Sequence, residues 1–398
     1  MHSRGGAWAC LFLSLIGLAL SGYMYFIHLG LLRGELLGGA ACGGSGLFNC
    51  HAVAASPWGT ALGLPLPLWG LIGYLITLTL AALALALPAA AAEALALLLA
   101  AGVAFLLIDA ALLAVMVTQI RSLCLLCFGT YLVNALLAIG ARAGLGLQWG
   151  EAFKRIPAAL KSLDRAPQSS LLWLTAGAAA LGLAAVSGAQ ASVQLMSQSN
   201  PVAIRQQLRE FMAHQTRASV ALDQDPELGR AQNAIHVVEF SDFLCPVCQR
   251  ASKLNHIMLT THRDDVHFVF KNFPLDLECN PAIGRMVHPG ACAIAAAAEC
   301  AHRQGRFWPL HDRIFEQGRT YNPAQLRDDA AKTGLDVTQF DACMGSGEGM
   351  EAVRRDVAEG QRLGVASTPT HFINGYRLTG IMPPSFFQEL ARVLREGP

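Results

Sequence analysis

The distribution of charge along the chain constrains its fold more than any other feature. Of 29 basic and 28 acidic residues, only 13 lie in residues 1–190, whereas 44 lie in residues 191–398. So few charges suit a hydrocarbon environment, while the second half has the charge content of an ordinary soluble domain. The net charge of +1 and the 53% hydrophobic content support neither nucleic-acid binding nor disorder. The sequence therefore predicts a membrane half followed by a soluble half.

Five apolar stretches in the first half are long enough, or nearly so, to cross a bilayer as helices, which takes roughly 20 residues. We predict membrane spans at Trp8–Leu32, Leu64–Leu87, Ala94–Val117, Leu123–Gly140 and Leu171–Ala189. The first stretch could be a cleaved signal peptide. However, its apolar run is about twice the length of a signal core and no small-x-small site ends it, so we expect a retained helix.

Basic residues set the expected orientation, because short cytoplasmic loops are enriched in Lys and Arg. Between the fourth and fifth spans lie Arg142, Lys154, Arg155, Lys161 and Arg165. If this segment is cytoplasmic, the N-terminus and the 88–93 turn are cytoplasmic too. The 33–63 loop, the 118–123 turn and everything after residue 190 then face the opposite side. Ten of the eleven cysteines lie at or beyond that outer face, where disulfides persist, and Cys10 is expected to be a small hydrophobe in the first span.

Two cysteine pairs mark the membrane half. Cys42 and Cys50 flank a Gly-rich loop, Cys42-Gly-Gly-Ser-Gly-Leu-Phe-Asn-Cys50, and could form a mobile dithiol or merely brace the loop. Cys124-Leu-Leu-Cys127 opens the fourth span at its outer end, where free N–H groups and a partial positive charge favour a thiolate. Either pair alone could be inert. Together on one face, they indicate redox chemistry.

Asp109 lies inside the third span, where an ionisable residue is a functional candidate by default. The simpler interpretation is that Asp109 points into the bundle and hydrogen-bonds a neighbouring helix.

An ordered set of motifs spans about residues 8–141: the Cys42/Cys50 pair, Ser56-Pro-Trp-Gly59, Gly63-Leu-Pro-Leu-Pro-Leu-Trp-Gly70 with Tyr74, and Cys124-Leu-Leu-Cys127 followed by Tyr131. This set resembles the vitamin K epoxide reductase family, in particular its bacterial members. The resemblance implies four helices around a quinone, with Cys124 and Cys127 as the active-site pair and Cys127 closest to the quinone. It further implies that Cys42 and Cys50 shuttle electrons inward, and that Tyr131 and Ser56 lie at the quinone site.

One position departs from the animal members of that family. Where they carry an asparagine that holds a vitamin K carbonyl, this chain has the apolar Leu66-Pro67. The resemblance therefore favours reduction of ubiquinone or menaquinone over the epoxide reaction.

The soluble half contains a third dithiol. A polar stretch over residues 191–230, with an amphipathic helix at Ile204–His214, is expected to be a tether. A strand at Ile235–Phe240 then leads to Cys245-Pro-Val-Cys248 at the start of a helical pattern, which is the thioredoxin arrangement. We expect Cys245 in the first helical turn, where its thiolate is stabilised, and Cys248 to be the less exposed, resolving cysteine.

The elements that follow extend this pattern. A strand at Val266–Lys271 precedes a helical insertion over residues 290–364, and Asn374-Gly375 suits a hairpin turn ahead of a final helix at Pro384–Glu396. With Thr368-Pro369 before the hairpin, this order over about residues 234–398 resembles the DsbA-like class of thioredoxin folds. The resemblance implies that Pro369 is cis and lies against the CxxC, and that Thr368 offers backbone groups to a substrate.

Four further cysteines leave two interpretations open. Cys279, Cys292, Cys300 and Cys343 could join Cys245 and Cys248 in a zinc site. The thioredoxin-like context favours structural disulfides instead, and of the three possible connectivities we prefer Cys279–Cys292 with Cys300–Cys343. No metal is therefore expected, and since no nucleotide-binding motif occurs in a supporting context, no nucleotide cofactor either.

We therefore predict a membrane α-helical bundle, a four-helix core plus a fifth linking helix, followed by an α/β thioredoxin-fold domain with a helical insertion. The expected parts are a quinone-reducing domain (1–145), a cytoplasmic basic loop with the fifth helix (146–190), a polar tether (191–233) and a DsbA-like domain (234–398).

The functional hypothesis is a thiol:quinone oxidoreductase of the bacterial plasma membrane that forms disulfide bonds in secreted or envelope proteins, with its thioredoxin-like domain in the periplasm or extracytoplasmic space. Electrons would pass from substrate thiols through Cys245/Cys248, Cys42/Cys50 and Cys124/Cys127 to the membrane quinone pool. Two alternatives remain. The same modules could run as a disulfide reductase or isomerase, because direction depends on redox potentials, or the chain could be a non-enzymatic membrane anchor that carries a binding module.

Overall fold

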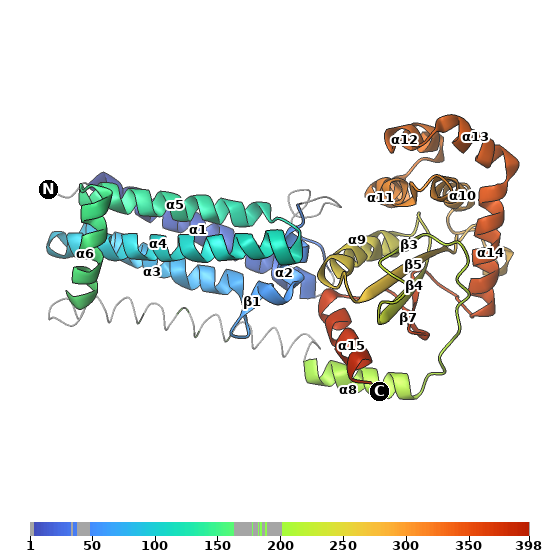
Figure 1. Cartoon of the computed structure of the whole chain (residues 1–398), viewed down its shortest axis with the longest axis horizontal. Helices are drawn as coiled ribbons and strands as arrows, with labels where there is room; N and C mark the ends of the chain where they lie inside the picture. The colour runs from blue at the N-terminus through green and yellow to red at the C-terminus, as the bar shows by residue number, and fades with distance from the viewer. Residues whose placement is uncertain are drawn as a thin grey trace. The chain divides into compact units, whose positions relative to one another are not determined.

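The computed structural model describes residues 4–32, 35–37, 48–162 and 201–397, with the single residues 177, 182, 184 and 188. The chain divides into two compact units, Met1–Asn200 and Pro201–Pro398. The described part of the first unit is almost entirely helical, and the second combines a sheet with helices (Figure 1).

Four long apolar helices dominate the first unit: α1 (Arg4–Leu32), α3 (Leu66–Ala86), α4 (Ala91–Val115) and α5 (Leu125–Leu145). The third of them extends from Pro88 to Ile120 through the 3-10 helix η3 (Pro88–Ala90) and the π-helix η4 (Met116–Ile120). By length and composition all four can cross a membrane, and they match the first four predicted spans. The fifth predicted span, Leu171–Ala189, lies outside the described residues. The chain is a membrane protein.

Small side chains let these helices pack side by side, with α1 against α3 and α5, and α4 against α5 (Figure 1). A Cβ at Gly6 of α1 would lie 2.4 Å from the backbone nitrogen of Gly144 on α5, so that crossing requires glycine. Cys10 is completely buried nearby, and its Sγ donates to the Leu137 carbonyl at 3.7 Å. Cys10 is thus a small core residue, as expected.

Short elements complete the first unit. Between α1 and α3 lie α2 (Cys50–Ala55), η2 (Pro57–Gly59) and a hairpin of β1 (Thr60–Ala61) with β2 (Leu64–Pro65). After α5 the chain forms α6 (Trp149–Ser162), which packs against α4. The expected basic loop therefore contains a helix. It buries Ala152 and Ala159 on one face and exposes Lys154, Arg155 and Lys161.

The second unit is built on a five-stranded sheet of order β3-β5-β4-β6-β7. Its strands are β3 (Glu227–Leu228), β4 (Ile235–Ser241), β5 (Val266–Asn272), β6 (Thr370–Ile373) and β7 (Tyr376–Thr379). β4 and β5 are parallel, which requires a crossover connection, and α9 (Pro246–Thr261) supplies it. The β6–β7 hairpin turns at Asn374 and Gly375, whose positive φ values of 47° and 87° suit the expected Asn-Gly turn.

The helical insertion follows β5 and comprises α10 (Ala291–His302), α11 (Phe307–Gln317), α12 (Leu326–Lys332), α13 (Val337–Ser346) and α14 (Glu348–Arg362), with short 3-10 turns η5 (Pro281–Ile283), η6 (Gly318–Thr320) and η7 (Pro323–Gln325). Disulfides join Cys279 to Cys292 and Cys300 to Cys343, the pairing preferred from the sequence. The second links α10 to α13. Because these four sulfurs are bonded to each other, they are not ligands for a zinc ion at the CxxC.

Part of the predicted tether belongs to this domain. The helix α8 (Pro201–Ala213) packs against the final helix α15 (Pro384–Glu396), buries Leu208 and Met212, and forms an ion pair of 3.1 Å between Arg205 and Glu389. The strand β3 then pairs with the edge of β5. Residues 201–228 are therefore packed on the fold, because the apolar face of α8 is buried there.

Candidate active sites

The CxxC of the first unit stands at the start of α5. Cys124 is the N-cap residue, is 3% exposed, and accepts a hydrogen bond at 3.2 Å from the backbone N–H of Cys127. The turn before it reverses the chain through Arg121, which has a positive φ of 54°. Cys127 lies in the first helical turn, where free backbone N–H groups and the helix dipole favour negative charge. Cys124 and Cys127 therefore lie at the start of a long apolar helix, as the sequence predicted.

The loop before α2 holds Cys50 against this CxxC. Phe48 and Leu123 form a parallel bridge, and the Asn49 N–H donates to the Leu123 carbonyl at 2.9 Å. The Asn49 side chain also caps α2 by accepting from the Ala52 N–H at 2.9 Å. These bonds place the side chain of Cys50, 4% exposed, in one buried cluster with Cys124. Cys42, its predicted partner, lies outside the described residues.

A cavity of about 210 Å³ opens beside these cysteines in the first unit. Cys50, Cys124, Cys127 and Tyr131 line it, as do aliphatic and aromatic side chains from α1, α3 and α4. An apolar cavity with a few polar groups is typical of a binding site for a small molecule. Ser56 is not among the lining residues, because its hydroxyl donates to the Val53 carbonyl at 2.8 Å. Of these two residues, Tyr131 lines the cavity and Ser56 does not.

A polar network that the sequence did not predict as a site lines the same cavity. The Tyr74 hydroxyl donates to Asn134 Oδ1 at 2.8 Å, and Asn134 Nδ2 donates to Asp109 Oδ2 at 2.9 Å. Asp109 thus hydrogen-bonds a neighbouring helix, as the simpler interpretation of the sequence proposed, and it also lines the cavity. The helical spacing was the available signal, since Cys127, Tyr131 and Asn134 lie one turn apart along one face of α5.

The cavity fits a quinone by its chemistry. Its walls are mainly apolar, and its polar side chains include His28, Tyr131 and the network of Tyr74, Asn134 and Asp109. Ser21 also lines it, and among the described residues its buried hydroxyl has no hydrogen-bond partner. A buried hydroxyl without a partner is costly, so a bound carbonyl oxygen would satisfy it.

The CxxC of the second unit follows β4. We expected Cys245 in the first turn of the helix, but it is the N-cap residue of α9, because Pro246 takes the first helical position. Cys245 is 5% exposed and Cys248 is fully buried. The Thr368–Pro369 peptide bond is cis, and the Cys245 thiol donates to the Thr368 carbonyl at 3.5 Å. Thr368 and Pro369 thus lie where the resemblance placed them.

The two sulfurs differ in acidity because their surroundings differ. The pKa of Cys245 is lowered to about 6, mainly by a hydrogen bond from the Cys248 side chain. Burial opposes this shift, whereas the backbone N–H groups of Val247 and Cys248 support it. Burial raises the pKa of Cys248 well above that of an ordinary thiol. Near neutral pH this difference in acidity suits Cys245 to the attacking role and Cys248 to the resolving role that the sequence predicts.

Comparison with known proteins identifies both units. The vitamin K epoxide reductase family matches residues 8–141, and the DSBA-like thioredoxin domain matches residues 236–391. The chain joins a VKOR-family domain to a DsbA-like domain. Both families are thiol-disulfide oxidoreductases. We call these matched segments the VKOR domain and the DsbA-like domain.

Similarity to whole proteins covers only part of the chain or of the relative. The Na(+)/H(+) antiporter NhaA 3 of Salinispora tropica is 32% identical over 158 residues, which cover 40% of this chain and 23% of the antiporter. NhaA of Herminiimonas arsenicoxydans is 32% identical over 160 residues, 39% of this chain and 24% of that protein. The chain thus spans about a quarter of the length of these relatives.

Two solved structures are among those similar to the chain. A thioredoxin-like oxidoreductase from Silicibacter pomeroyi is 24% identical with a TM-score of 0.38, and covers 44% of this chain and 95% of its own. Oxidised BdbD from Bacillus subtilis is 21% identical with a TM-score of 0.37, and covers 46% of this chain and 96% of its own.

A second group of residues that the sequence did not single out lies under the CxxC of the DsbA-like domain. Glu239 on β4 is 1% exposed, accepts from the Asn255 side chain, and pairs with the fully buried His371 at 2.9 Å. Burial opposes ionisation of Glu239, but His371 and the hydrogen bonds outweigh it and lower the pKa of Glu239. The available signal was a carboxylate inside the apolar strand Ile235–Phe240. Its charge acts on Cys248 and helps to keep that thiol protonated.

Proposed function

We propose that the chain is a membrane thiol:quinone oxidoreductase that forms disulfide bonds in proteins outside the cytoplasm. The observation that carries this proposal is the contact of Cys50 with Cys124 at the wall of a cavity that Cys127 and Tyr131 also line. Cys50 at the start of α2, the CxxC of α5 and a cavity for a small apolar acceptor thus adjoin one another within the VKOR domain.

The proposed electron path consists of three thiol-disulfide exchanges. A substrate thiolate attacks the Cys245–Cys248 disulfide, the substrate leaves as a disulfide, and Cys245 and Cys248 retain two electrons. The reduced pair then passes these electrons to a Cys42–Cys50 disulfide. Finally Cys50, in contact with Cys124, reduces the Cys124–Cys127 disulfide. In each exchange one disulfide breaks as another forms, so electrons and sulfur bonds balance.

Within the VKOR domain the residues have distinct proposed tasks. A quinone, ubiquinone or menaquinone, would accept two electrons and two protons when the Cys124/Cys127 dithiol returns to the disulfide. Tyr131 and Asn134 would hold its polar edge, and the apolar walls exclude water. Asp109 accepts a hydrogen bond from one N–H of the Asn134 side-chain amide, and the second N–H of Asn134 would serve the cavity. No metal or nucleotide is needed in this scheme.

The acidity of Cys245 supports the oxidising direction over the reductase or isomerase alternative. A thiolate with a pKa of about 6 is already ionised at neutral pH, which stabilises the reduced pair. A dithiol whose reduced form is stabilised has a more oxidising potential. The Cys245/Cys248 pair is therefore suited to take electrons from substrates and pass them inward.

The route is tested in membranes that contain the full chain and a quinone. With Cys127→Ala, the Cys42–Cys50 disulfide can accept one electron pair but cannot pass it on, so Cys245 and Cys248 should stay reduced after a second round of substrate oxidation. Cys10→Ala is the matched control, since Cys10 is a buried cysteine of the same domain outside the route. The redox state is read by alkylation and mass spectrometry. Reoxidation in Cys127→Ala at the wild-type rate would eliminate the proposed route.

The partner of Cys245 within the chain is also testable. Cys50 is buried against Cys124, so we expect the other loop cysteine to receive the attack. In a Cys248→Ala chain the mixed disulfide should accumulate between Cys245 and Cys42. A crosslink that persists in Cys42→Ala and disappears in Cys50→Ala would reverse the assignment.

A further inference from the structure

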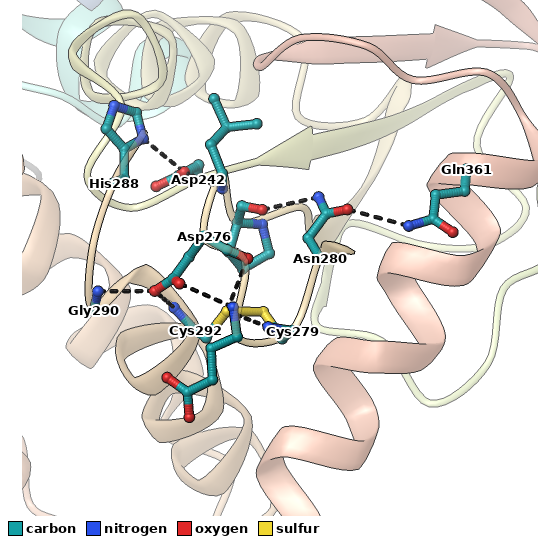
Figure 2. Close-up of a disulfide and its surroundings, with 11 residues drawn as sticks. Asp242, Asp276, Cys279, Asn280, His288, Gly290, Cys292 and Gln361 are labelled. Carbon is teal, nitrogen blue, oxygen red and sulfur yellow. Dashed lines mark hydrogen bonds and ion pairs between the residues drawn. A yellow bond between two sulfur atoms is a disulfide. The ribbon is translucent and has the colours of Figure 1, made fainter. Parts of the chain in front are cut away.

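A histidine from outside the CxxC is fixed beside the active site of the DsbA-like domain. His288 Nδ1 is 2.8 Å from Asp242 Oδ2, and the His288 side chain is 10% exposed (Figure 2). Asp242 is buried, and its backbone carbonyl accepts from the Cys245 N–H at 3.1 Å. His288 is therefore bound to the turn that presents Cys245, although it lies 43 residues later in the chain.

The segment that carries His288, residues 273–290, is fixed at several points. The Leu275 N–H donates to Asp242 Oδ2 at 2.7 Å, and the Leu275 carbonyl accepts from the His288 N–H at 2.9 Å. Asp276 accepts from the Gly290 N–H at 2.8 Å, and the Cys279–Cys292 disulfide joins this segment to α10 (Figure 2). Asp242 also accepts from the Leu244 N–H at 2.8 Å. The imidazole is thus held in one position relative to the CxxC.

The CxxC itself offers no cation. Pro246 and Val247 separate the two cysteines, and neither side chain can donate a hydrogen bond or carry a charge. Three charged groups act on His288 from different elements: Asp242 after β4, Cys245 at the start of α9 and Arg319 on η6. The hydrogen bond to Asp242 is the largest influence, and with the Cys245 thiolate it raises the pKa of His288, whereas burial and Arg319 lower it.

We propose that His288, positioned by Asp242, is an electrostatic partner of the Cys245 thiolate that stabilises the reduced Cys245/Cys248 pair and so increases its oxidising strength. The inference rests on the proposed thiol exchange at Cys245. In the disulfide form Cys245 carries no charge, so the imidazolium loses this partner. In the reduced form the two opposite charges attract across a partly buried site. His288 is a positioning residue here, because it acts through the charge of Cys245.

Substitution of His288 separates its charge from its hydrogen bond. His288→Gln retains an N–H donor for Asp242 but cannot carry a charge, whereas His288→Lys carries a charge at every pH of interest. In the full chain in nanodiscs, the rate of Cys245 alkylation is followed against pH by peptide mass spectrometry. With His288→Gln we expect the midpoint to rise by roughly half to one pH unit, and His288→Lys should restore it.

The same variants predict a change in redox equilibrium. Against glutathione, His288→Gln should shift the Cys245/Cys248 equilibrium toward the disulfide by roughly three- to tenfold, or about 14 to 30 mV. His256→Gln is the matched control, because His256 pairs with Asp312 at 3.0 Å and lies 11 residues along α9 from Cys245, about 16 Å by helical rise. That distance exceeds the screening length of roughly 8 Å at physiological salt.

A measurement on the unsubstituted chain tests the coupling independently of folding. By reciprocity, the pKa of His288 must be higher in the reduced than in the oxidised chain by the shift that His288 causes at Cys245. Histidine C2 hydrogen exchange, read by mass spectrometry, gives that pKa in both redox states. Equal values in the two states overturn the inference, as does an unchanged Cys245 profile in folded His288→Gln. If the wild-type chain exchanges no disulfide at Cys245, the proposed function fails instead.

Discussion

Cysteine residues in this chain differ in chemistry because their immediate neighbours differ. Cys10 sits among helix backbones in the membrane bundle and is a packing residue. Cys248 is buried, and both this burial and the charge of Glu239 keep its thiol protonated. Cys245, three residues earlier, accepts hydrogen bonds at a helix N-terminus and ionises readily. The immediate neighbours of each cysteine therefore decide which sulfur ionises more readily.

Removal of the Cys248 thiol tests this division of roles. In Cys248→Ala, Cys245 loses the largest influence that lowers its pKa, so its alkylation midpoint should rise from about 6 toward that of an ordinary thiol. At pH values above the pKa of an ordinary thiol, the wild-type Cys245 thiolate stabilises the folded, reduced domain. This stabilisation is lost as the pH falls through about 6. Cys10→Ala should leave the midpoint unchanged. A midpoint near 6 in Cys248→Ala would contradict the assigned cause.

Asn134 offers a second test at the residue scale. In Asn134→Leu, Asp109 and Tyr74 each lose a buried hydrogen-bond partner, and the cavity loses an N–H donor. We expect the KM for quinone to rise by at least fivefold, in line with about 1 kcal/mol for a lost hydrogen bond. Leu132→Ala is the control, because Leu132 on the same helix is 61% exposed. The measurement is quinone reduction by the full chain, and a KM equal to wild type would exclude Asn134 from the site.

Helix packing in the VKOR domain positions the cavity network at the scale of elements. Gly17 on α1 faces the Tyr74 ring on α3, and a Cβ there would lie 2.3 Å from that ring. The absence of a side chain on α1 therefore lets Tyr74 reach Asn134 on α5. Three helices contribute to one hydrogen-bonded chain only because α1 and α3 approach this closely.

Gly17→Ala should disturb the site through this contact. The added methyl group must displace the Tyr74 ring, so we expect weaker quinone binding together with a lower thermal stability of the bundle. Gly22→Ala is the matched control, because no atom lies within 4 Å of a Cβ at Gly22 on the same helix. Thermal unfolding and quinone KM are measured for both variants. Similar behaviour of Gly17→Ala and Gly22→Ala would show that Tyr74 does not depend on the α1 contact.

The disulfide between α10 and α13 should stabilise the helical insertion without taking part in exchange. Cys300 and Cys343 are 43 residues apart in sequence. The closed loop lowers the entropy of the unfolded chain and so raises its free energy by about 4 kcal/mol. In the double variant Cys300→Ala, Cys343→Ala, the free energy of unfolding of the DsbA-like domain should fall by about 2 to 4 kcal/mol. Denaturation of the full chain measures this loss. The Cys245 alkylation profile is the internal control and should not move.

At the scale of the whole molecule, the proposed relay requires that all three dithiols face the same side of the membrane. The basic residues Lys154, Arg155 and Lys161 are exposed on α6, which favours a cytoplasmic position for that end of the bundle. The β1–β2 hairpin and the CxxC of α5 would then face outward, and the predicted fifth span, Leu171–Ala189, would have to carry the DsbA-like domain to the same side. An electron path from substrate to quinone needs no crossing of the bilayer in this orientation.

Impermeant thiol labelling of single introduced cysteines tests this orientation in spheroplasts. Leu62→Cys in the hairpin and Leu222→Cys in the second unit replace residues that are 90% and 46% exposed, and both should be labelled. Ala89→Cys in η3, also exposed, should be labelled only after the membrane is permeabilised. If Leu62→Cys and Leu222→Cys were labelled from opposite sides, the relay would be impossible.

The sequence by itself determined the features that depend on local patterns. Apolar runs located the four long helices, because a span needs a continuous apolar segment, and the CxxC motifs located both reactive helix starts. Asn374-Gly375 located the hairpin, since a tight turn needs residues that tolerate positive φ. The helix α9 begins at Pro246, one residue later than the start that we predicted at Cys245, because proline favours the first helical position.

Tertiary structure decided the features that join distant parts of the chain. The contact of Cys50 with Cys124, the chain from Tyr74 through Asn134 to Asp109, and the pair of Asp242 with His288 all link residues far apart in sequence. Ser56, which the sequence predicted at the quinone site, donates its hydroxyl to the Val53 carbonyl and does not line the cavity. Such proximity depends on how helices and loops pack, and packing is a property of the whole fold that no local pattern encodes.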